Sequence, residues 1–367
     1  MLTVGACTDG GSGDADETSS MASPLPVSRC SSLDGEGWST SDDLREASGF
    51  EALALASSGD AVVALAAPAG FGYWSSDGLT WTRAEGKPEL GGGCPLTVSG
   101  GAEGFVATGT TGATPVTAFS RDGRVWETVP ASTWPAGDVE WFADVCAGDD
   151  GFIVAGATGD ALGSFAWSSA DGRAWSVTPL SPGQVFAATA TAAGWLALTV
   201  SREPTDGDVA VWTSPDGQDW THVDAASAPP ADALLAYCGT APLASGDGAT
   251  VLAPTEGGDE HAIPDVTVWT SADDGAAWTE NLVVDVSERG QFAVHDLAWT
   301  SVGFVLTGVV DDPGPSEDQA SFISFSDDGS AWRTCWTTEE LTEVEPLGDG
   351  LVLLDEESML VHVWTGP

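Results

Sequence analysis

The chain has 367 residues, of which 42% are hydrophobic and 18% charged, so it is long and apolar enough to bury a core. Fifty-six acidic residues face ten basic ones, and the resulting net charge of −46 repels phosphate backbones and excludes nucleic acid as a partner. No run of 18 or more apolar residues occurs, so we expect no membrane-spanning helix from this sequence.

The first residues resemble the cleavage site of a bacterial lipoprotein. In "LTVGAC" (2–7) small residues precede Cys7, the position that such proteins lipidate, and a segment rich in Gly, Ser and Asp follows. A signal peptide needs a charged start and about 7–15 apolar residues, so we expect the true start to lie upstream or to be trimmed. A chance cysteine near the terminus is the alternative. We therefore interpret residues 1–28 as a lipobox-like start and tether, and 29–367 as the folded domain.

One short motif recurs seven times in that domain. It reads Ser-x-Asp-Gly-x-x-Trp, as in "SSDGLTW" (75–81), and one copy, "SADDGAAW" (271–278), carries an extra residue. The spacings between its tryptophans are 43, 45, 49, 45, 58 and 54 residues, a period that indicates propeller blades or a solenoid. The aspartates and tryptophans of the seven copies are Asp34, Asp77, Asp122, Asp171, Asp216, Asp273, Asp328, Trp38, Trp81, Trp126, Trp175, Trp220, Trp278 and Trp332.

Three strand-like runs separate consecutive motifs. One opens with glycine and continues as an apolar, β-prone run, as in "GFIVAG" (151–156), which is how a strand buried on both faces reads. Another precedes it, and a third ends in an aromatic and a hydroxyl residue, as at Trp167 and Ser168. No sustained apolar stripe of helical period occurs, so helices should be few. Four strands per period, joined by tight turns, describe a propeller blade.

The two ends of the domain complement each other. Three strand-like runs follow Trp332, whereas "DGEGWSTS" (34–41) holds a motif and a fourth strand with no three strands ahead of it. Pairing the ends closes the ring and removes unpaired edges. We therefore predict an all-β fold, a seven-bladed β-propeller of four-stranded antiparallel blades whose last blade is closed by both termini.

Turn chemistry explains the motif. Glycine supplies the positive φ of a tight turn, the aspartate accepts backbone N–H groups, the serine adds a local contact, and the tryptophan covers the turn. We expect each copy to hold its own hairpin without help from the rest of the fold. The alternative is that the seven motifs are calcium-binding or ligand-binding loops. Most copies, however, hold a single aspartate at the motif position, and one carboxylate is too few to bind a hard cation.

The motif resembles the Asp-box, or bacterial neuraminidase repeat, whose usual form is S-x-D-x-G-x-x-W. The copy at 271–278 matches it in full, and the other six have one residue fewer between Asp and Trp. The resemblance covers about residues 30 to 367. It implies that the boxes are structural and lie between the third and fourth strands of each blade, away from the active face.

Asp-box propellers include sialidases, other glycosidases, sortilin-like receptors and assembly factors resembling those of photosystem II. Sialidases resemble one another in an arginine triad, a tyrosine nucleophile with a glutamate partner, an aspartate acid and an Arg-Ile-Pro stretch. No Arg-Ile-Pro occurs here, and a triad would require Arg45, Arg202 and Arg289 with Tyr237. The four histidines lack metal-site spacing, so we assign no catalytic residue, metal or cofactor.

The loops opposite the motifs lengthen in the later blades, at 201–208, 254–265 and 311–320. Long loops on a rigid scaffold commonly carry binding, although solvated acidic loops without a role are the alternative. Our ligand-face candidates are Trp134, Arg202, Glu203, Asp259, Glu260, His261, Arg289, Asp311 and Asp312. Five further cysteines have no C-x-x-C spacing and an unassigned pairing: Cys30, Cys94, Cys146, Cys238 and Cys335.

Our leading hypothesis is a non-catalytic, surface-tethered propeller that binds a protein or glycan at the cell envelope. It would be a monomer without a cofactor, lipid-anchored at the bacterial surface or secreted, and would contact the membrane through the lipid alone. The alternative is a secreted glycoside hydrolase, sialidase-like or other, using two of the acidic residues on the face opposite the boxes. An assembly factor for a membrane complex is a third possibility.

Overall fold

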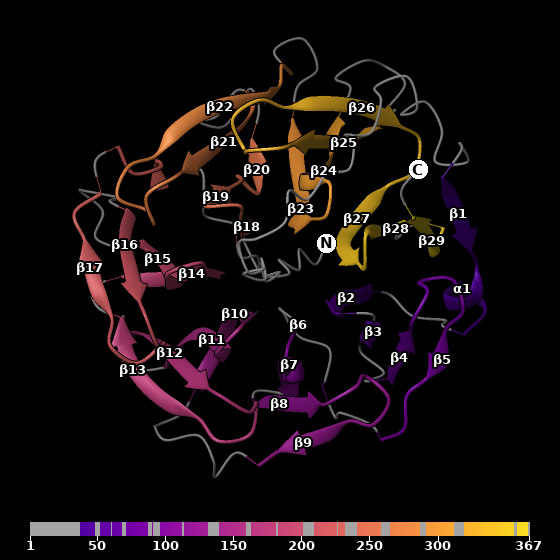
Figure 1. The fold of residues 1–367 in the computed structure, drawn as a ribbon, viewed down its shortest axis with the longest axis horizontal. Coiled ribbons are helices and arrows are strands. Elements are labelled where there is room, and N and C mark those ends of the chain that lie inside the picture. Colours follow the sequence, from indigo (N-terminus) through magenta and orange to yellow (C-terminus); the bar gives the residue numbers. More distant parts are fainter. Residues whose placement is uncertain are drawn as a thin grey trace, which may run out of the picture.

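The computed structural model describes residues 37–47, 52–59, 61–67, 71–86, 90, 96–111, 114–130, 139–158, 163–180, 183–200, 209–225, 227–231, 241–257, 265–286, 291–311, 319–355 and 358–365. Within them the backbone forms seven antiparallel sheets arranged as blades around one axis (Figure 1). The predicted seven-bladed β-propeller is therefore confirmed. No helix in the described part of the chain is long and apolar enough to cross a membrane.

Each blade is named here in chain order, with its strands given from the innermost outward. Blade 1 is β2 (Ala52–Ser58), β3 (Ala61–Ala67), β4 (Phe71–Ser75) and β5 (Thr82–Arg83); blade 2 is β6 (Thr97–Gly101), β7 (Gly104–Thr111), β8 (Thr114–Ser120) and β9 (Glu127–Val129); blade 3 is β10 (Val139–Gly148), β11 (Gly151–Thr158), β12 (Ser164–Ser169) and β13 (Ser176–Leu180); blade 4 is β14 (Gln184–Thr191), β15 (Gly194–Val200), β16 (Val209–Ser214) and β17 (Thr221–Val223).

The remaining three blades include the closing one and the one that departs from the four-strand plan. Blade 5 is β18 (Leu243–Gly246), β19 (Ala249–Leu252), β21 (Val266–Ser271) and β22 (Thr279–Val284); blade 6 is β20 (Glu256–Gly257), β23 (Phe292–Thr300), β24 (Gly303–Asp311), β25 (Gln319–Ser326) and β26 (Arg333–Thr337); blade 7 is β27 (Leu341–Leu347), β28 (Gly350–Asp355), β29 (Leu360–Trp364) and β1 (Trp38–Ser41).

Both ends of the domain build blade 7, as predicted. β1 pairs antiparallel with β29, with Trp38 opposite Trp364 and Ser41 opposite Val361. A single helical turn, α1 (Asp43–Ala47), follows β1, and its Leu44 is fully buried in the apolar cluster shared by blades 7 and 1. The first described strand therefore seals the ring instead of leaving β29 as an open edge.

Blade 6 gains a fifth strand that the sequence pattern did not predict. β20 comes from the long connection between β19 and β21 of blade 5, and it pairs with β23, the first of the four regular strands of blade 6. The N–H of Val294 also donates to the carbonyl oxygen of Thr255, at 2.9 Å. This short crossing links blades 5 and 6 through backbone hydrogen bonds.

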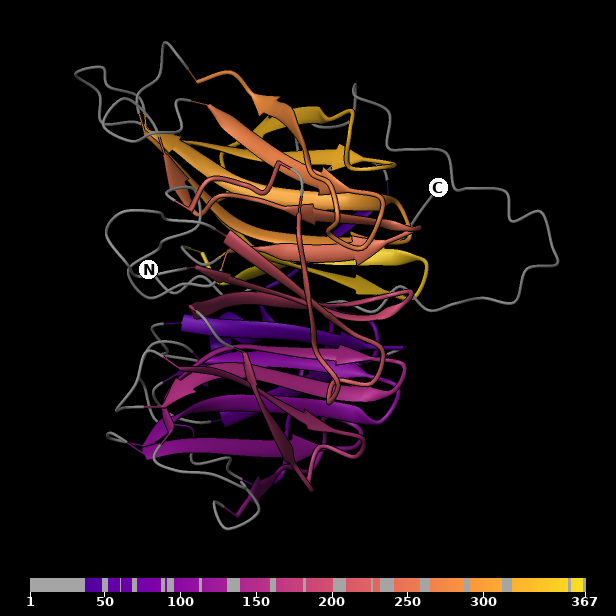
Figure 2. The same ribbon diagram turned by 90° about the vertical axis from the view of Figure 1, so that its left-hand side faces the viewer.

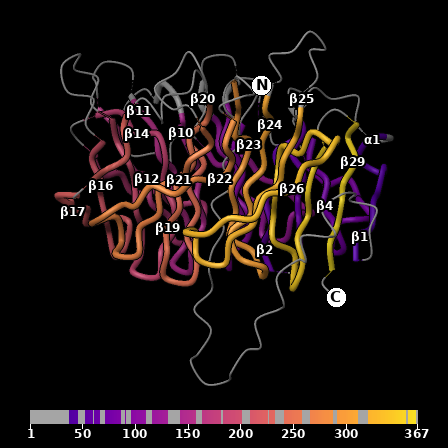
Figure 3. The backbone as a smooth tube through the Cα atoms, turned by 90° about the horizontal axis from the view of Figure 1, so that it is seen from above, coloured from indigo at the N-terminus to yellow at the C-terminus, as the bar shows by residue number. Residues whose placement is uncertain are grey.

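Strand alternation gives the ring two distinct faces, seen edge-on in Figures 2 and 3. In every antiparallel blade the first-to-second and third-to-fourth turns lie at one end, which we call the turn face. The second-to-third connections and the links between blades leave from the other end, which we call the loop face. The six motifs that the structure describes in full lie on the turn face, because each one joins a third strand to a fourth.

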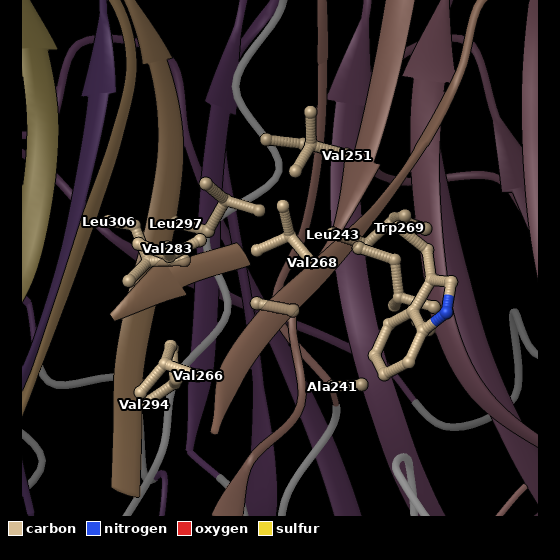
Figure 4. Close-up of a cluster of buried hydrophobic side chains, with 14 of the residues drawn as sticks. Ala241, Leu243, Val251, Val266, Val268, Trp269, Val283, Val294, Leu297 and Leu306 are labelled. Atoms are coloured by element: carbon tan, nitrogen blue, oxygen red, sulfur yellow. The ribbon is translucent and has the colours of Figure 1, made fainter. Parts of the chain in front are cut away.

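The apolar core consists of clusters packed between neighbouring blades. Figure 4 shows one of them, in which Leu243, Val251 and Val268 of blade 5 lie beside Leu297 and Leu306 of blade 6. All five side chains are at most 3% exposed. Since each blade buries its faces against its neighbours, the stability of the ring resides in the seams between blades.

Candidate functional site

The motif turns have the local geometry that their residue types predict. In the copy that ends at Trp81, the Oδ1 of Asp77 accepts the N–H groups of Leu79 and Thr80, at 2.9 and 2.7 Å. The hydroxyl of Ser75 donates to the same oxygen at 2.9 Å, and the Trp81 indole N–H donates to the Gly78 carbonyl at 2.9 Å. The carboxylate is thus committed to holding its own turn.

The same arrangement recurs in most of the other copies. Asp171, Asp216, Asp273 and Asp328 each accept from a motif serine and from backbone N–H groups of their own turns. Asp122 accepts the N–H of Arg124 at 3.0 Å, and Asp34 lies outside the described residues.

These bonds favour ionised motif aspartates. The backbone N–H groups of Ala174 and Arg173 lower the pKa of Asp171, and those of Asp219 and Gln218 lower the pKa of Asp216. Within the described residues, no group of three or more His, Cys, Asp or Glu side chains is arranged to hold a metal ion. A structural role therefore accounts for the motif carboxylates.

The motif glycines show that each copy also reaches its neighbour, contrary to our expectation of a self-sufficient hairpin. Gly172 has a φ of +70°, and a Cβ there would lie 2.3 Å from Cδ2 of Phe119 in the preceding blade. At Gly217 (φ +71°) the corresponding contact would be 2.6 Å, to Cδ1 of Ile153. Glycine is needed both for its backbone conformation and for the close approach of the two blades.

The motif tryptophans lie in the same seams. Trp126 belongs to the cluster built from blades 1 and 2, and Trp175 to that of blades 2 and 3. Both indoles are buried, with exposures of 4% and 6%. Nearby, the guanidinium of Arg173 lies 3.9 Å from the ring centroid of Phe119, so the arginine also serves the seam. Such use of arginine on the turn face leaves these side chains unavailable for a substrate clamp.

A second set of contacts joins the blades near the axis, and the sequence pattern did not reveal it to us. Asp144 on β10 accepts the N–H of Ala188 in blade 4 at 3.5 Å, and Asp296 on β23 accepts the N–H of Val344 in blade 7 at 2.8 Å. Both carboxyl groups are at most 2% exposed, and each follows a β-bulge in its strand. The two residues therefore occupy equivalent positions in different blades.

Blade 7 supplies two more such groups. Glu343, which also follows a bulge, accepts the N–H of Leu55 in blade 1 at 3.4 Å, and Glu345 accepts the N–H of Ser57 at 3.1 Å. We call Asp144, Asp296, Glu343 and Glu345 the inner carboxyl groups. Burial raises the pKa of Glu345 and of Asp144 well above the usual range, and the negative charge of Asp296 adds to both shifts.

A sequence signal for these groups exists. Each acid interrupts an apolar innermost strand, as Asp144 does in "FADVCAG" and Glu345 in "LTEVEPL". A lone carboxyl group within a buried strand requires a hydrogen-bonding partner, and here the partner is the backbone of the next blade. The sequence therefore indicates that these acids need a partner, but only the closed ring shows which backbone N–H groups they bind.

The predicted ligand face falls mostly outside the described residues. Asp311 ends β24, where it pairs with Gln319 at the loop face, and the structure describes its backbone. The other eight candidates lie beyond the described ranges: Trp134, Arg202, Glu203, Asp259, Glu260, His261, Arg289 and Asp312. The described strands that flank these candidates in the chain end at the loop face.

The sialidase constellation gains no support from the described part of the chain. Arg45 lies on α1 at the outer edge of blade 7. The other residues that a sialidase site would require, Arg202, Arg289 and Tyr237, lie outside the described residues. On the turn face, a hollow of about 190 Å³ is lined by Asp149, Asp150, Trp195 and other residues of blades 3 and 4. Its two acids are exposed turn residues and form no arrangement typical of catalysis.

Comparison with known proteins identifies the fold alone. No family model matches the sequence, and no curated protein matches it. A catalytically inactive virginiamycin B lyase from Staphylococcus aureus, solved with quinupristin, is similar with a TM-score of 0.53 and 10% identity over 85% of this chain and 93% of its own. The β-propeller domain of Swd1 from Myceliophteria thermophila is similar with a TM-score of 0.51 and 12% identity, over 90% and 100%.

YCF48 from Cyanidioschyzon merolae matches with a TM-score of 0.48 and 11% identity, over 89% of this chain and 98% of its own. Two fucose-binding or fucose-bound lectins also match, with TM-scores of 0.43 and 0.45. At 10% and 12% identity, the likeness to the virginiamycin B lyase and to the Swd1 domain shows a shared propeller fold and nothing more.

Proposed function

We propose that this chain is a non-catalytic β-propeller that binds a protein or glycan partner through its loop face, outside the cytoplasm. The observation that supports this most directly is that the turn face has a structural role, which leaves the loop face for binding. The turn face uses its aspartates, arginines and tryptophans to hold turns and seams, as at Asp77, Arg173 and Trp175. The described strands that precede and follow the candidate ligand residues end at the opposite face.

The absence of catalysis in this proposal rests on how the clustered acids are used. A glycoside hydrolase needs two carboxyl groups about 5–10 Å apart that a substrate can reach. The inner carboxyl groups are the acids that the described structure brings together, and they are buried and bonded to backbone N–H groups of adjacent blades. They are therefore part of the scaffold.

Disulfide bonds support a location outside the cytoplasm. Cys146 and Cys335 are both disulfide-bonded. They cannot bond to each other, because Cys146 lies on an innermost strand of blade 3 and Cys335 on the outer strand of blade 6, across the ring (Figure 1). Two separate disulfides in one chain favour an oxidising compartment, in agreement with export and with the lipid anchor that we propose at Cys7.

Binding and its alternative, glycoside hydrolysis, can be separated in one set of assays. The purified protein is tested on a panel of fluorogenic glycosides, on immobilised glycans and against envelope extracts. We expect saturable binding without turnover, lost in an Arg202→Ala, Asp259→Ala variant of the loop face. An Asp150→Ala variant of the turn face is the matched control and should bind as the wild type does. Turnover that a loop-face carboxyl substitution abolishes would establish the hydrolase instead.

The anchor and the monomeric state are tested separately. A clickable fatty acid fed to expressing cells should label the wild-type chain but not Cys7→Ser. Light scattering of the unlipidated protein should give the mass of one 37.3 kDa chain. Labelling that persists in Cys7→Ser would refute the anchor without affecting the binding proposal.

A further inference from the structure

The seam that closes the ring, between blades 7 and 1, differs from the others in its density of carboxyl contacts. Near the axis, Glu343 and Glu345 of β27 both accept N–H groups of β2. At the rim, the hydroxyl of Ser41 donates to the Leu79 carbonyl, and Asp43 accepts the Trp81 N–H at 3.2 Å. Blade 7, on one side of this seam, is the blade that contains both the first and the last described strands, β1 and β29.

Glu345 has an unusual hydrogen-bonding state within this seam. Its Oε2 accepts both the N–H and the hydroxyl of Ser57, at 3.1 and 2.8 Å. Its Oε1 is buried and has no hydrogen-bond partner among the described residues, and the residue is 1% exposed. An ionised carboxylate would leave one buried, negatively charged oxygen without a donor from the described protein, which costs far more than leaving a neutral carboxyl group there.

Among the described residues, the titratable groups around Glu345 do not offset that cost. Asp296 on β23 is close enough for its charge to disfavour ionisation of Glu345. β23 also carries His295, whose Nδ1 lies 3.0 Å from the Leu341 carbonyl, and burial lowers the pKa of His295 and so favours its neutral form. The other titratable groups on strands packed against β27 are acids: Glu343 on β27 itself, Asp355 on β28 and Asp311 at the end of β24. β2, β3 and β25 carry none.

We propose that Glu345 acts as a proton-dependent latch on ring closure: its neutral carboxyl group holds blade 7 against blade 1, and its ionisation loosens that seam. The bond to Ser57 spans the two blades, so any change in the state of the carboxyl group acts directly across the closing seam. The ring is then closed most firmly in acidic surroundings. This inference does not depend on what the loop face binds.

The sign of the effect follows from linkage. The raised pKa of Glu345 means that the closed ring retains a proton which the opened seam releases. The stabilisation is complete below the ordinary glutamate value and is lost as the pH rises from there toward the raised pKa. Within that range the equilibrium constant for seam opening increases by up to about tenfold per pH unit, and above it the constant levels off.

Hydrogen exchange with mass spectrometry on the full chain tests the proposal directly, because it measures the protection of β2 in the seam between blades 7 and 1. In the wild type, the protection factor of peptides covering β2 should fall as the pH rises, after correction for intrinsic exchange. Glu345→Gln keeps an oxygen acceptor for Ser57 and cannot ionise, so its β2 protection should be independent of pH. Glu280→Gln, an exposed carboxylate on β22, is the matched control and should follow the wild type.

Peptides from β14 serve as an internal reference, because Asp144, another inner carboxyl group, contacts β14 in the seam between blades 3 and 4. The protection of β14 should be the same in Glu345→Gln as in the wild type. If Glu345→Gln does not fold, Ser57→Ala provides the second test. Loss of the hydroxyl donor removes a bond that favours the ionised form, so the fall in β2 protection should extend to higher pH. An unchanged pH profile of β2 in either variant would overturn the proposal.

Discussion

The close approach of the motif glycines predicts a specific penalty for replacing one of them. In Gly172→Ala, the new methyl group meets the ring of Phe119, with Cδ2 at 2.3 Å and Cε2 at 2.8 Å. The ring cannot retreat, because Phe119 is 1% exposed, packs edge-on against Phe152 at 6.4 Å and lies beneath Arg173. The two blades must therefore separate locally to accommodate one carbon atom.

The magnitude has two parts that a control variant separates. Placing alanine in the left-handed region, at the φ of +70° of Gly172, costs about 1–2 kcal/mol. Overpacking against a closed core adds about 1–3 kcal/mol, for a total of about 2–5 kcal/mol. Gly59 has a φ of +59°, and no heavy atom lies within 4 Å of the position that a Cβ would take there, so Gly59→Ala should show the backbone part alone.

Calorimetry of the two variants beside the wild type measures the difference. With about 2 cal/mol/K of unfolding entropy per residue, 1 kcal/mol lowers the melting temperature of a domain this size by roughly 1–2 °C. The overpacking part alone distinguishes the two, so Gly172→Ala should melt about 1–6 °C below Gly59→Ala. Equal melting temperatures would refute the claim that the motif glycine is a contact between blades, and would leave it a turn residue alone.

Three further outcomes are expected. Asp171→Ala should lower the free energy of unfolding by about 1 kcal/mol, since the N–H groups that it releases are solvent-accessible. Because the pKa of Asp171 is lowered in the folded state, the difference between variant and wild type should be complete at neutral pH and vanish in strong acid. A difference that does not depend on pH would contradict this linkage. Trp175→Ala should cost about 3–5 kcal/mol in urea unfolding because the indole fills the seam of blades 2 and 3, whereas a loss under about 1 kcal/mol would contradict its burial. Reduction of the disulfides of Cys146 and Cys335 should lower stability by about 2–4 kcal/mol each, and melting curves unaffected by reductant would argue against their structural role.

The repeat made the ring predictable. Seven blades and their closure follow from a period near 45 residues, a turn signal in each repeat and two complementary ends. These features are predictable because turn chemistry and strand alternation depend on residues that are adjacent in the sequence. The position of the motifs on one face followed from the same alternation. The placement of Arg124 and Arg173 beside motif turns, away from any substrate clamp, was likewise predictable from their positions in the chain.

The contacts between blades were not predictable in the same way. Gly172 meets Phe119, and Glu345 meets Ser57, across 53 and 288 positions in the chain, respectively. The pairing of such residues depends on how far each blade rotates about the axis and on the bulges that turn Asp144, Asp296 and Glu343 toward the next blade. The sequence alone determined how many blades there are and how each hairpin turns. Tertiary packing alone decided which side chains join the blades, because those partners become neighbours only when the ring is closed.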